Sequence, residues 1–454
     1  MTEILRSVGL DVGTTSTQLI FSALTVENQS GPFSVPEMRI AQRQILYKSP
    51  VYFTPLADGD RVDADALREI VAREYTRAGI HRETVDTGAI IITGETSRKE
   101  NAEAVLRELS GFAGDFVVAT AGPDLESVLA AKGAGAVAYS RETGKRILHM
   151  DIGGGTSNLA LIEDGIIVAT GCLNVGGRLL KFDENGMVTY VSPVLKDLTD
   201  LAVGSRVTEA QVEKIAVLLT RALEMAAGYR EPNSLLEMLT TAGTAMEPVT
   251  GDVVISFSGG VADCIDTQQP WLTYGDLGPV LGKTIRRSRL CAGEYTLGRE
   301  TIRATVIGAG CHSAQLSGST VYHRNVHFPL KNVPVIPVPR ALEESSKLPQ
   351  YLRQELEKRE GTGVIALHGA AASSYEAVRA LAERISRGVD SGTVAVCLEA
   401  DMAKALGQAL ALRRPESPIL CIDRVKVQEE SYLDVGAPVG PALPVVVKTI
   451  VLNQ

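Results

Sequence analysis

The sequence predicts an α/β protein with a duplicated core and an additional α/β module towards its C-terminal end. Three observations lead to this prediction. Strand patterns alternate with helical patterns along most of the chain, which is typical of α/β layer folds. A strand, a glycine turn and a second strand occur near residue 11 and again near residue 151. The 454 residues are too many for one compact core and suggest about two or three domains.

The first block opens with a hairpin. Residues 4–10 and 17–21 are two apolar strands around a polar turn that contains glycine. Residues 25–62 are rich in proline, glycine and polar side chains. Apolar residues on one helical face predict a helix over residues 63–79. The elements that follow are strands at 89–93, 116–120 and 146–150 and helices at about 98–110 and 124–139.

The second block repeats the opening pattern. A strand from residue 147 runs into a glycine turn at 153–155, and strands are expected at 158–163 and 166–171. The pattern then predicts helices at about 208–227 and 232–244 and strands at 253–257 and 305–307. This duplication is the main organisational signal of the chain.

Beyond residue 330 the composition changes. The proline-rich residues 334–339 predict a linker, and residues 342–360 a charged helical stretch. The elements that follow are strands at 364–367, 394–398 and 419–425 and helices at 375–387 and 402–412. The domains we expect are residues 1–140, completed by about 304–330, then residues 141–303, and then residues 331–454.

The composition argues against several classes of protein. With 45 basic and 54 acidic residues, the net charge of −9 argues against a nucleic-acid-binding surface. The first residues are charged, and no run approaches the roughly 18 apolar residues of a membrane helix, so we expect a cytoplasmic protein without a membrane segment. The six cysteines are far apart and contain no C-x-x-C pair, which argues against a zinc site or a disulfide framework. Glycine is the one unusual count, with 43 residues, and these are clustered.

Two of the glycine clusters share one pattern. In residues 10–16 and 150–157 a strand delivers an aspartate, an aliphatic residue follows, and then come glycines and hydroxyl residues. Turn amides form an anion-binding concavity, and glycine lets a ligand approach the backbone. An aspartate at each turn can hold Mg²⁺ through water or orient an attacking water. A structural hairpin explains either turn alone, but two copies at equivalent places favour a polyphosphate site.

These motifs resemble the sugar kinase, heat-shock chaperone and actin ATPase superfamily, in which two related α/β domains clamp ATP and Mg²⁺. Four further segments match in the expected order. They are 122–139 and 304–310, similar to the two interdomain helices, 174–177, similar to the glycine pair after the second phosphate hairpin, and 257–263, similar to the adenosine motif. The resemblance implies duplicated actin-like (ribonuclease H-like) ATPase domains with an interdomain nucleotide cleft.

A closer resemblance is to the ethanolamine ammonia-lyase reactivating factors, the EutA family. It extends through residues 94–101, 276–282, 401–407 and 435–450 and so covers essentially the whole chain. It implies an ATP-dependent chaperone with ATP and Mg²⁺ as ligands and ethanolamine ammonia-lyase as partner. The chaperone would release damaged cobalamin from the lyase so that intact adenosylcobalamin, the cofactor of the lyase, can rebind. Whether the protein forms a homo-oligomer and whether it associates with a bacterial microcompartment stay open.

The resemblance also implies site residues. Asp11 and Asp151 are the carboxylates for Mg²⁺, bound through water, and for the attacking water, and Glu126 is a third catalytic acid. Glu95, just past a strand end, is a further candidate. The residues implied to contact phosphate are Gly13, Thr14, Thr15, Gly153, Gly154, Gly155 and Thr156, and those implied to contact adenosine are Gly259 and Gly260.

Other patterns have simpler explanations. Residues 278–284 look like a P-loop, but only three residues separate the glycines where four are needed. The glycines of residues 133–138 look like a dinucleotide fingerprint, but they lie in a helical pattern, where small residues pack helices. Cys311 and His312 could be taken for a nucleophile pair, but adjacent residues generally point in different directions, which favours a structural role. The charged residues 343–360 are most simply a solvated helix face, with a docking surface as the alternative.

Three function classes remain at this point. The first is the reactivating ATPase. The second is a small-molecule kinase of the same superfamily, in which a carboxylate such as Asp151 would activate a substrate hydroxyl. The third is an actin-like ATPase scaffold. An iron–sulfur activator also exists on this fold, but the scattered cysteines speak against it.

Overall fold

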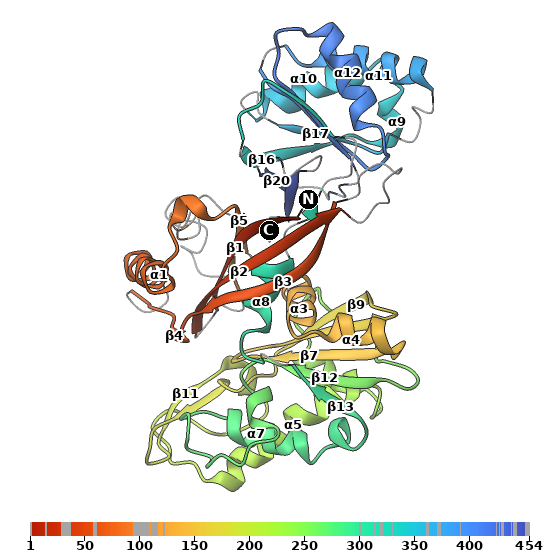
Figure 1. The fold of residues 1–454 in the computed structure, drawn as a ribbon. Helices are drawn as coiled ribbons and strands as arrows, with labels where there is room; N and C mark the ends of the chain where they lie inside the picture. Colours follow the sequence, from red (N-terminus) through yellow and green to blue (C-terminus); the bar gives the residue numbers. More distant parts are fainter. Residues whose placement is uncertain are drawn as a thin grey trace.

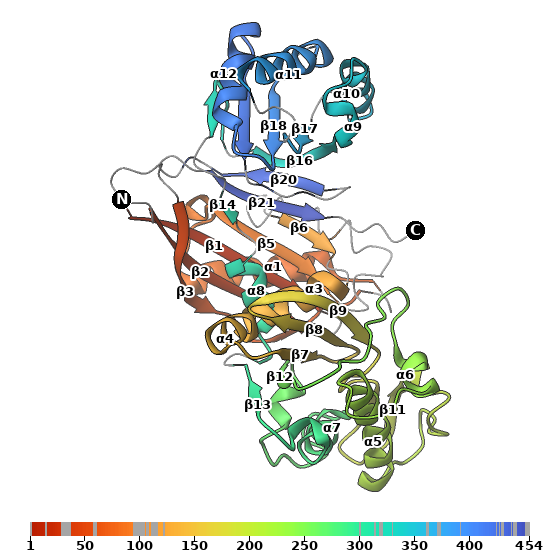
Figure 2. The ribbon, with the colours of Figure 1, turned by 90° about the vertical axis from the view of Figure 1, so that its right-hand side faces the viewer.

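A computed structural model describes residues 2–449 of the chain apart from short segments. The segments outside the description are 14–15, 29–37, 58–60, 94–104, 106–108, 110–116, 121–122, 299–300, 313–314, 317–320, 329, 360–362, 370–373, 391, 424, 426, 428–430, 437 and 439–442. The described residues form three bodies in a row, each built around one large sheet (Figures 1 and 2). The body of the first sheet lies between the other two.

The first sheet has the strand order β3-β2-β1-β5-β6. Its elements are β1 (Thr2–Val12), β2 (Ser16–Asn28), β3 (Met38–Lys48), β4 (Tyr52–Phe53), which pairs with β2, β5 (Thr87–Ile92), β6 (Val117–Thr120) and the helix α1 (Ala64–Ala78). Strand β1 is antiparallel to β2 and parallel to β5. The expected hairpin, helix 63–79 and strands 89–93 and 116–120 are confirmed. The expected helix at 98–110 lies almost entirely outside the described residues.

Parts of residues 25–62 form strands, although the segment is rich in proline, glycine and polar side chains. Strand β2 continues to Asn28, and β3 pairs with it in antiparallel register from Met38 to Lys48. Pairing along a long neighbouring strand stabilises this polar segment as a strand, whatever its local propensity.

The second sheet has the order β9-β8-β7-β12-β13. Its strands are β7 (Ile147–Ile152), β8 (Ser157–Glu163), β9 (Ile166–Leu173), β12 (Val254–Ser258) and β13 (Tyr295–Leu297). Strand β7 is antiparallel to β8 and parallel to β12. If the strands on each main path are numbered 1 to 5 in chain order, which leaves out β4 and the two short strands that follow β9, both sheets have the order 3-2-1-4-5. Neighbouring strands also have the same relative directions in both sheets. The expected duplicated actin-like core is confirmed by this topology.

The remaining elements of the second body pack against one face of its sheet. They are β10 (Leu180–Phe182), β11 (Val188–Val191), α5 (Glu209–Ala226), α6 (Ser234–Leu239) and α7 (Gly278–Arg286). The described chain also has short 3-10 helices at Arg82–Thr84, Pro193–Leu195, Ala262–Cys264 and Arg289–Cys291. Helix α5 matches the expected 208–227, whereas α6 is much shorter than the expected 232–244.

Three helices connect the first and second bodies: α3 (Pro123–Gly133), α4 (Ala136–Thr143) and α8 (Ala304–His312). The single helix expected at 124–139 is wrong, because Gly135 has a φ of 85° and separates α3 from α4. The strand expected at 305–307 is also wrong. These β-branched residues are helical because α8 packs along α3, as its resemblance to an interdomain helix implies.

Glycines let α3 and α8 approach each other closely. A Cβ atom at Gly133 would lie 1.8 Å from the carbonyl oxygen of Ala304, and one at Gly308 would lie 2.1 Å from that of Leu129. The glycine-rich residues near 133 therefore serve helix packing, as expected, and not dinucleotide binding.

The third sheet has the order β14-β21-β20-β16-β17-β18-β19-β15. Its strands are β14 (Gln315–Leu316), β15 (Tyr322–Arg324), β16 (Leu330–Pro337), β17 (Val364–Leu367), β18 (Val394–Leu398), β19 (Ile419–Asp423), β20 (Ser431–Val435) and β21 (Pro444–Thr449). The helices are α9 (Arg340–Glu343), α10 (Leu348–Glu357), α11 (Tyr375–Gly388) and α12 (Ala403–Arg413), on one side of the sheet in Figure 2. The alternation expected after residue 364 is confirmed. Strands β14 and β15 pair with this sheet although they fall within residues 304–330, and the domain boundaries stay a prediction.

The linker expected at 334–339 is wrong. Strand β16 lies inside the sheet, between β17 and β20. Val333 and Val335 belong to one core and Ile336 and Val338 to another, the alternation of a strand with two buried faces. Proline lacks the donor that a central strand uses, so the tertiary contacts override the local signal here.

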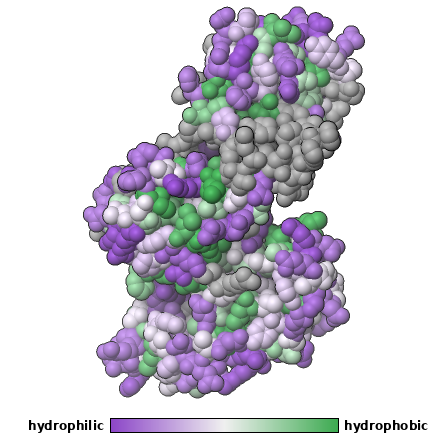
Figure 3. All heavy atoms as spheres, viewed as in Figure 1, coloured by the Kyte–Doolittle hydropathy of each residue, from purple (hydrophilic) through white to green (hydrophobic). Residues whose placement is uncertain are grey.

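The charged residues 343–360 are solvated only in part. Hydrophilic residues cover much of the visible face around α10, α11 and α12 (Figure 3). Glu343, however, is buried, and its carboxylate accepts hydrogen bonds from the backbone of His368 and Gly369. This glutamate ties α9 to the loop after β17, so the expectation of a plain solvated face is wrong at this position.

Among the described residues, the cysteine side chains at 172, 264, 291, 397 and 421 are buried and form no disulfide bond. No helix in the described part of the chain is long and apolar enough to span a bilayer.

Candidate functional site

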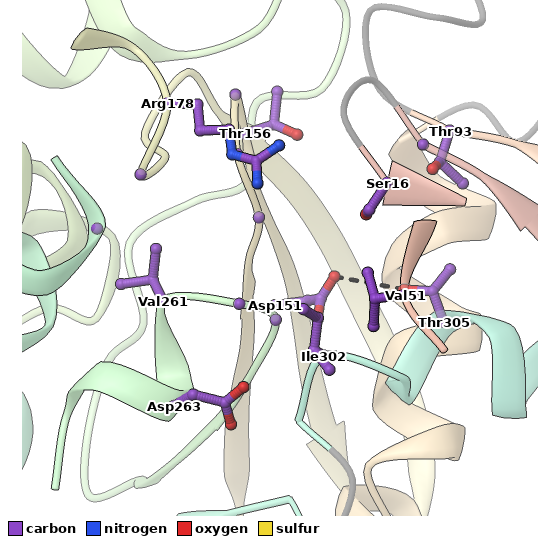
Figure 4. Close-up of a pocket in the computed structure, with 18 of the residues that line it drawn as sticks. Ser16, Val51, Thr93, Asp151, Thr156, Arg178, Val261, Asp263, Ile302 and Thr305 are labelled. Atoms are coloured by element: carbon purple, nitrogen blue, oxygen red, sulfur yellow. Dashed lines mark hydrogen bonds between the residues drawn. The ribbon is translucent and has the colours of Figure 1, made fainter. Parts of the chain in front are cut away.

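A cavity of about 270 Å³ lies between the first and second bodies. The turn after β1 and the turn after β7 face each other across it, and α3 and the segment leading into α8 line it as well (Figure 4). Its lining residues are Asp11, Gly13, Ser16, Gln18, Val51, Thr93, Glu126, Asp151, Gly153–Thr156, Gly177, Arg178, Gly259–Val261, Asp263, Cys264, Tyr274, Asp276, Gly278, Ile302 and Thr305. Most residues expected from the sequence are therefore brought together.

Asp11 stands near the end of β1 and is 9% exposed. The Thr93 hydroxyl donates to its Oδ1 at 2.9 Å. Burial raises the pKa of Asp11 to about 7, the Thr93 hydrogen bond opposes the rise, and the charge of Asp151 adds to it. The ionised carboxylate of Asp11 is poorly solvated here, so a bound cation would stabilise its negative charge.

Asp151 occupies the equivalent position on β7. The Ser258 hydroxyl donates to its Oδ1 at 2.5 Å, and the Thr305 hydroxyl lies 3.4 Å from its Oδ2 (Figure 4). Burial raises the pKa of Asp151 to about 6, against the effect of both hydroxyls. The two aspartates thus enter one cavity from opposite walls.

The two glycine turns are closed by equivalent backbone hydrogen bonds. The amide of Gly13 donates to the Ser16 carbonyl at 2.9 Å, and the amide of Gly153 donates to the Thr156 carbonyl at 2.9 Å. Thr14 and Thr15 lie outside the described residues, so their predicted contacts with phosphate stay a prediction.

A second glycine pair supports the turn of β7. The amide of Gly177 donates to the Gly153 carbonyl at 3.0 Å, and a Cβ atom at Gly176 would lie 2.3 Å from the Gly154 carbonyl oxygen. The pair thus packs directly on the turn, and the contact at Gly176 leaves no room for a larger residue.

The other predicted residues lie around this centre. Glu126, half-buried on α3, lines the cavity. Gly259 has a φ of 85°, and a Cβ atom there would lie 2.3 Å from the Ile152 carbonyl oxygen, so only glycine fits. Gly260 also lines the cavity. Glu95 lies outside the described residues.

Two buried amide groups beside the aspartates carry orphaned oxygens. Gln18 lies opposite Asp11 in the pairing of β1 with β2, and Asn158 lies opposite Asp151 in the pairing of β7 with β8. Within the described residues, Gln18 Oε1 and Asn158 Oδ1 have no hydrogen-bond partner. A buried acceptor without a partner costs free energy, and at Gln18, which lines the cavity, a water or an ion there would offset this cost.

This donor set fits Mg²⁺ held by a nucleotide. Mg²⁺ prefers oxygen ligands, keeps several waters and is commonly shared between one or two carboxylates and phosphate oxygens. The described residues contain no cluster of three or more histidine, cysteine, aspartate or glutamate side chains that could hold a metal ion. A Mg²⁺ ion here would be bound by the aspartates together with phosphate and water, and this role of the aspartates stays a prediction.

Arg178 is the residue that the sequence interpretation missed. It is the one cationic side chain among the described residues that line the cavity. Its Nε lies 3.3 Å from Asp276 Oδ2, and its guanidinium lies 5.7 Å from the ring centre of Phe53 on β4 of the first body. Its amide donates to the Gly154 carbonyl at 2.6 Å. Its place directly after the glycine pair 176–177 is the signal that could have revealed it.

The opposite end of the cavity is lined by Asp263, Cys264 and Tyr274, next to Gly260. In Figure 4, Asp263 lies at the other end from Thr156 and Arg178. At this end of the cavity, Gly259 and Gly260 were the only residues singled out from the sequence. The neighbouring P-loop lookalike, residues 278–284, is the first part of helix α7 and not a phosphate loop.

The chain is similar to known proteins over nearly its whole length. A family model described as "Ethanolamine utilisation protein EutA" matches residues 3–453. The chain is 38% identical to the ethanolamine ammonia-lyase reactivase EutA of Salmonella typhimurium and 37% identical to that of Escherichia coli, in each case over 99% of both chains. Among solved structures, a Ppx/GppA family member from Aquifex aeolicus is 16% identical with a TM-score of 0.37, covering 68% of this chain and 87% of that one.

Proposed function

The chain belongs to the ethanolamine utilisation protein EutA family, and we propose from this premise that it is an ATP-dependent reactivating factor for adenosylcobalamin-dependent ethanolamine ammonia-lyase. The observation that carries the proposal is similarity over the full length to two proteins named as reactivases of that lyase. The cleft supports it, because a remodelling factor needs a source of free energy and the cleft has the groups for a nucleotide. A small-molecule kinase and an actin-like scaffold are not favoured by these relatives.

The nucleotide would lie along the cavity with its phosphates between the two glycine turns. Turn amides and the hydroxyl of Thr156 would contact the phosphates, and Gly259 and Gly260 would lie against adenosine. Arg178 would add a positive charge beside the turn of β7. This arrangement allows a chain of net charge −9 to bind a polyanion through amides, Mg²⁺ and one guanidinium.

Bound Mg²⁺ would neutralise phosphate charge and bring the carboxylates of Asp11 and Asp151 to a shared centre. Asp11 belongs to the first body and Asp151 to the second, so a ligand held by both would draw the bodies together. Either aspartate, or Glu126 on α3, could orient the attacking water. Hydrolysis would release the bodies, and the partner enzyme would be opened by the movement so that damaged cobalamin leaves.

The test uses the lyase itself. Ethanolamine ammonia-lyase is inactivated with cyanocobalamin, and the protein is added with ATP, Mg²⁺ and adenosylcobalamin. Recovery of ethanolamine deamination is expected, and it should require both ATP and Mg²⁺. Absence of recovery with the complete mixture would overturn the proposal.

Variants connect the test to the cleft. Asp11→Asn and Asp151→Asn should abolish recovery while the protein stays folded, since each removes a charge from the centre. Asp197→Asn, a change at an exposed carboxylate, is the matched control and should recover like the wild type. Full recovery with both cleft variants would contradict the roles proposed for these aspartates. Self-association and a place in a microcompartment of the cytoplasm stay predictions, to be examined by sedimentation and by cell fractionation.

A further inference from the structure

A chain of hydrogen bonds leads from Asp151 into the interior of the second sheet. His149 lies two residues before Asp151 on β7 and is fully buried. Its Nε2 is 2.9 Å from Ser258 Oγ, and its Nδ1 is 3.0 Å from Ser256 Oγ. Ser258 in turn donates to Asp151 Oδ1.

The pairing of β7 with β12 places these groups together. His149 lies opposite Ser256 and Asp151 lies opposite Ser258 in the parallel register. Residues two apart on a strand face the same side, so all four side chains share one face of the sheet. Histidine and two serines are unusual in the centre of an apolar sheet, where each polar group must find a partner.

The donor and acceptor roles follow from the chemistry of each group. An ionised carboxylate only accepts, so Ser258 must donate its one proton to Asp151. Towards His149, Ser258 can then only accept, which requires a proton on Nε2. Nδ1 is left as an acceptor for the hydroxyl of Ser256. The imidazole is neutral in this arrangement, with one ring nitrogen donating and the other accepting.

We propose that His149 is a positioning residue of the nucleotide site, which holds the hydroxyl of Ser258 and through it fixes the carboxylate of Asp151. Oδ1 of the aspartate is engaged by Ser258. Oδ2, whose described contact is the 3.4 Å approach of Thr305, remains for Mg²⁺ or its water. The fixed carboxylate lowers the reorganisation needed when the nucleotide arrives. This inference rests on the proposed nucleotide chemistry of the cleft.

In the described part of the first body, the corresponding positions have no such chain of hydrogen bonds. The position two residues before Asp11 is Gly9, and its neighbour on β5 is Ala89, neither of which carries a polar side chain. Asp11 is instead held by Thr93, one residue beyond β5. Among the residues that the structure describes, the duplicated cores therefore hold their aspartates differently, and only the second aspartate is connected to a buried imidazole.

The first experiment examines the hydrogen-bond chain in the nucleotide-free protein. Nitrogen-15 NMR of the histidine-labelled full chain is expected to show His149, assigned by its loss in His149→Gln, as the neutral tautomer with the proton on Nε2. A proton on Nδ1, or an imidazolium, at neutral pH would overturn the inference. This readout does not depend on ATP hydrolysis, so it separates failure of the inference from failure of the proposed function.

The second experiment measures steady-state ATP hydrolysis. Ser258→Ala is expected to lower kcat at least about tenfold with KM for ATP within about threefold, since the bound nucleotide keeps its other contacts. Ser258→Thr should restore kcat, because threonine keeps the hydroxyl. His149→Gln should lower kcat less than Ser258→Ala, and the double variant should be no worse than Ser258→Ala, because both changes act through one hydroxyl.

The control and the opposing outcomes are defined in the same assay. Ser140, on α4 and away from the cavity, is another buried serine, and its hydroxyl donates to the Lys145 carbonyl. Ser140→Ala should leave kcat unchanged. An unchanged kcat for a folded Ser258→Ala, or no rescue by Ser258→Thr, would overturn the inference. No hydrolysis by the wild type, with or without lyase, would instead count against the proposed function.

Discussion

Replacing Asp11 by asparagine should stabilise the nucleotide-free protein while abolishing its function. Asp11 is buried, and burial raises the pKa of its carboxyl to about 7 from 3.8. An ionised carboxylate in this place is less solvated than in the unfolded chain, so its charge destabilises the fold. Asparagine has nearly the same shape, and its Oδ1 can still accept from Thr93. The cost of the charge is removed and the hydrogen bond is kept.

The magnitude follows from linkage. Because the folded-state pKa is the higher one, the folded protein binds more protons between pH 3.8 and 7, and its stability falls as the pH rises through this window. The penalty reaches about 3 kcal/mol at pH 6 and about 4 kcal/mol at pH 8.5, at 1.36 kcal/mol per pKa unit. The stability gained by Asp11→Asn should therefore be larger at pH 8.5 than at pH 6, by about 1 kcal/mol.

Urea unfolding at the two pH values, followed by circular dichroism without nucleotide and without Mg²⁺, measures this difference. Asp197→Asn, at an exposed carboxylate, is the control and should show no such pH-dependent gain. Addition of ATP and Mg²⁺ should stabilise the wild type more than Asp11→Asn, since the cation then compensates the charge. A gain that is the same at pH 6 and pH 8.5, or a loss of stability at pH 8.5, would refute the reasoning.

Three further predictions concern single positions. Gly308→Ala places a Cβ atom 2.1 Å from the Leu129 carbonyl oxygen and should destabilise the protein by about 1–3 kcal/mol in urea unfolding. Gly407→Ala places a Cβ atom 2.4 Å from the Tyr322 ring and should cost a similar free energy, about 1–3 kcal/mol, measured in the same way. Arg178→Ala should weaken binding of ATP about tenfold or more but leave binding of adenosine nearly unchanged in calorimetric titrations, because it removes a charge beside the phosphates and not beside the base.

These three predictions have simple controls. At Gly293 no atom lies within 4 Å of an added Cβ, so Gly293→Ala should cost far less than either crowded substitution. Equal losses at all three glycines would contradict the close-packing argument. For Arg178, the control is Arg353 on α10, which pairs with Asp390 far from the cleft. An equal loss of ATP and adenosine binding in Arg178→Ala would show a structural role and not a phosphate contact.

The sequence allowed the pieces of the site to be predicted because they are local patterns. An apolar strand, an aspartate and a glycine turn are written in about ten residues, and the repeat near residue 151 reproduces them. The structure places Asp11 and Asp151 in one cavity, with Gly259 where only glycine fits. The roles of these residues towards ATP stay a prediction.

The errors have a common physical cause. The β-branched residues 305–307 favour a strand locally but are helical where α8 packs on α3. Pro334 and Pro337 suggest a linker but lie in a strand paired on both sides. In both cases contacts with segments distant in the sequence outweigh a local preference of a few tenths to about 1 kcal/mol per residue.

The sequence alone determined the family, the duplicated α/β core and the two aspartates with their glycine turns, because each depends on neighbouring residues or on a repeat along the chain. Only the tertiary structure showed what surrounds them. Ser256 is 107 positions from His149, and Arg178 is 98 positions from Asp276. Such partners are chosen by strand register and by the packing of one body on another. The excess of glycine, visible from the first count, is explained at Gly259, Gly176 and Gly308 by backbone atoms that no other residue would allow so close.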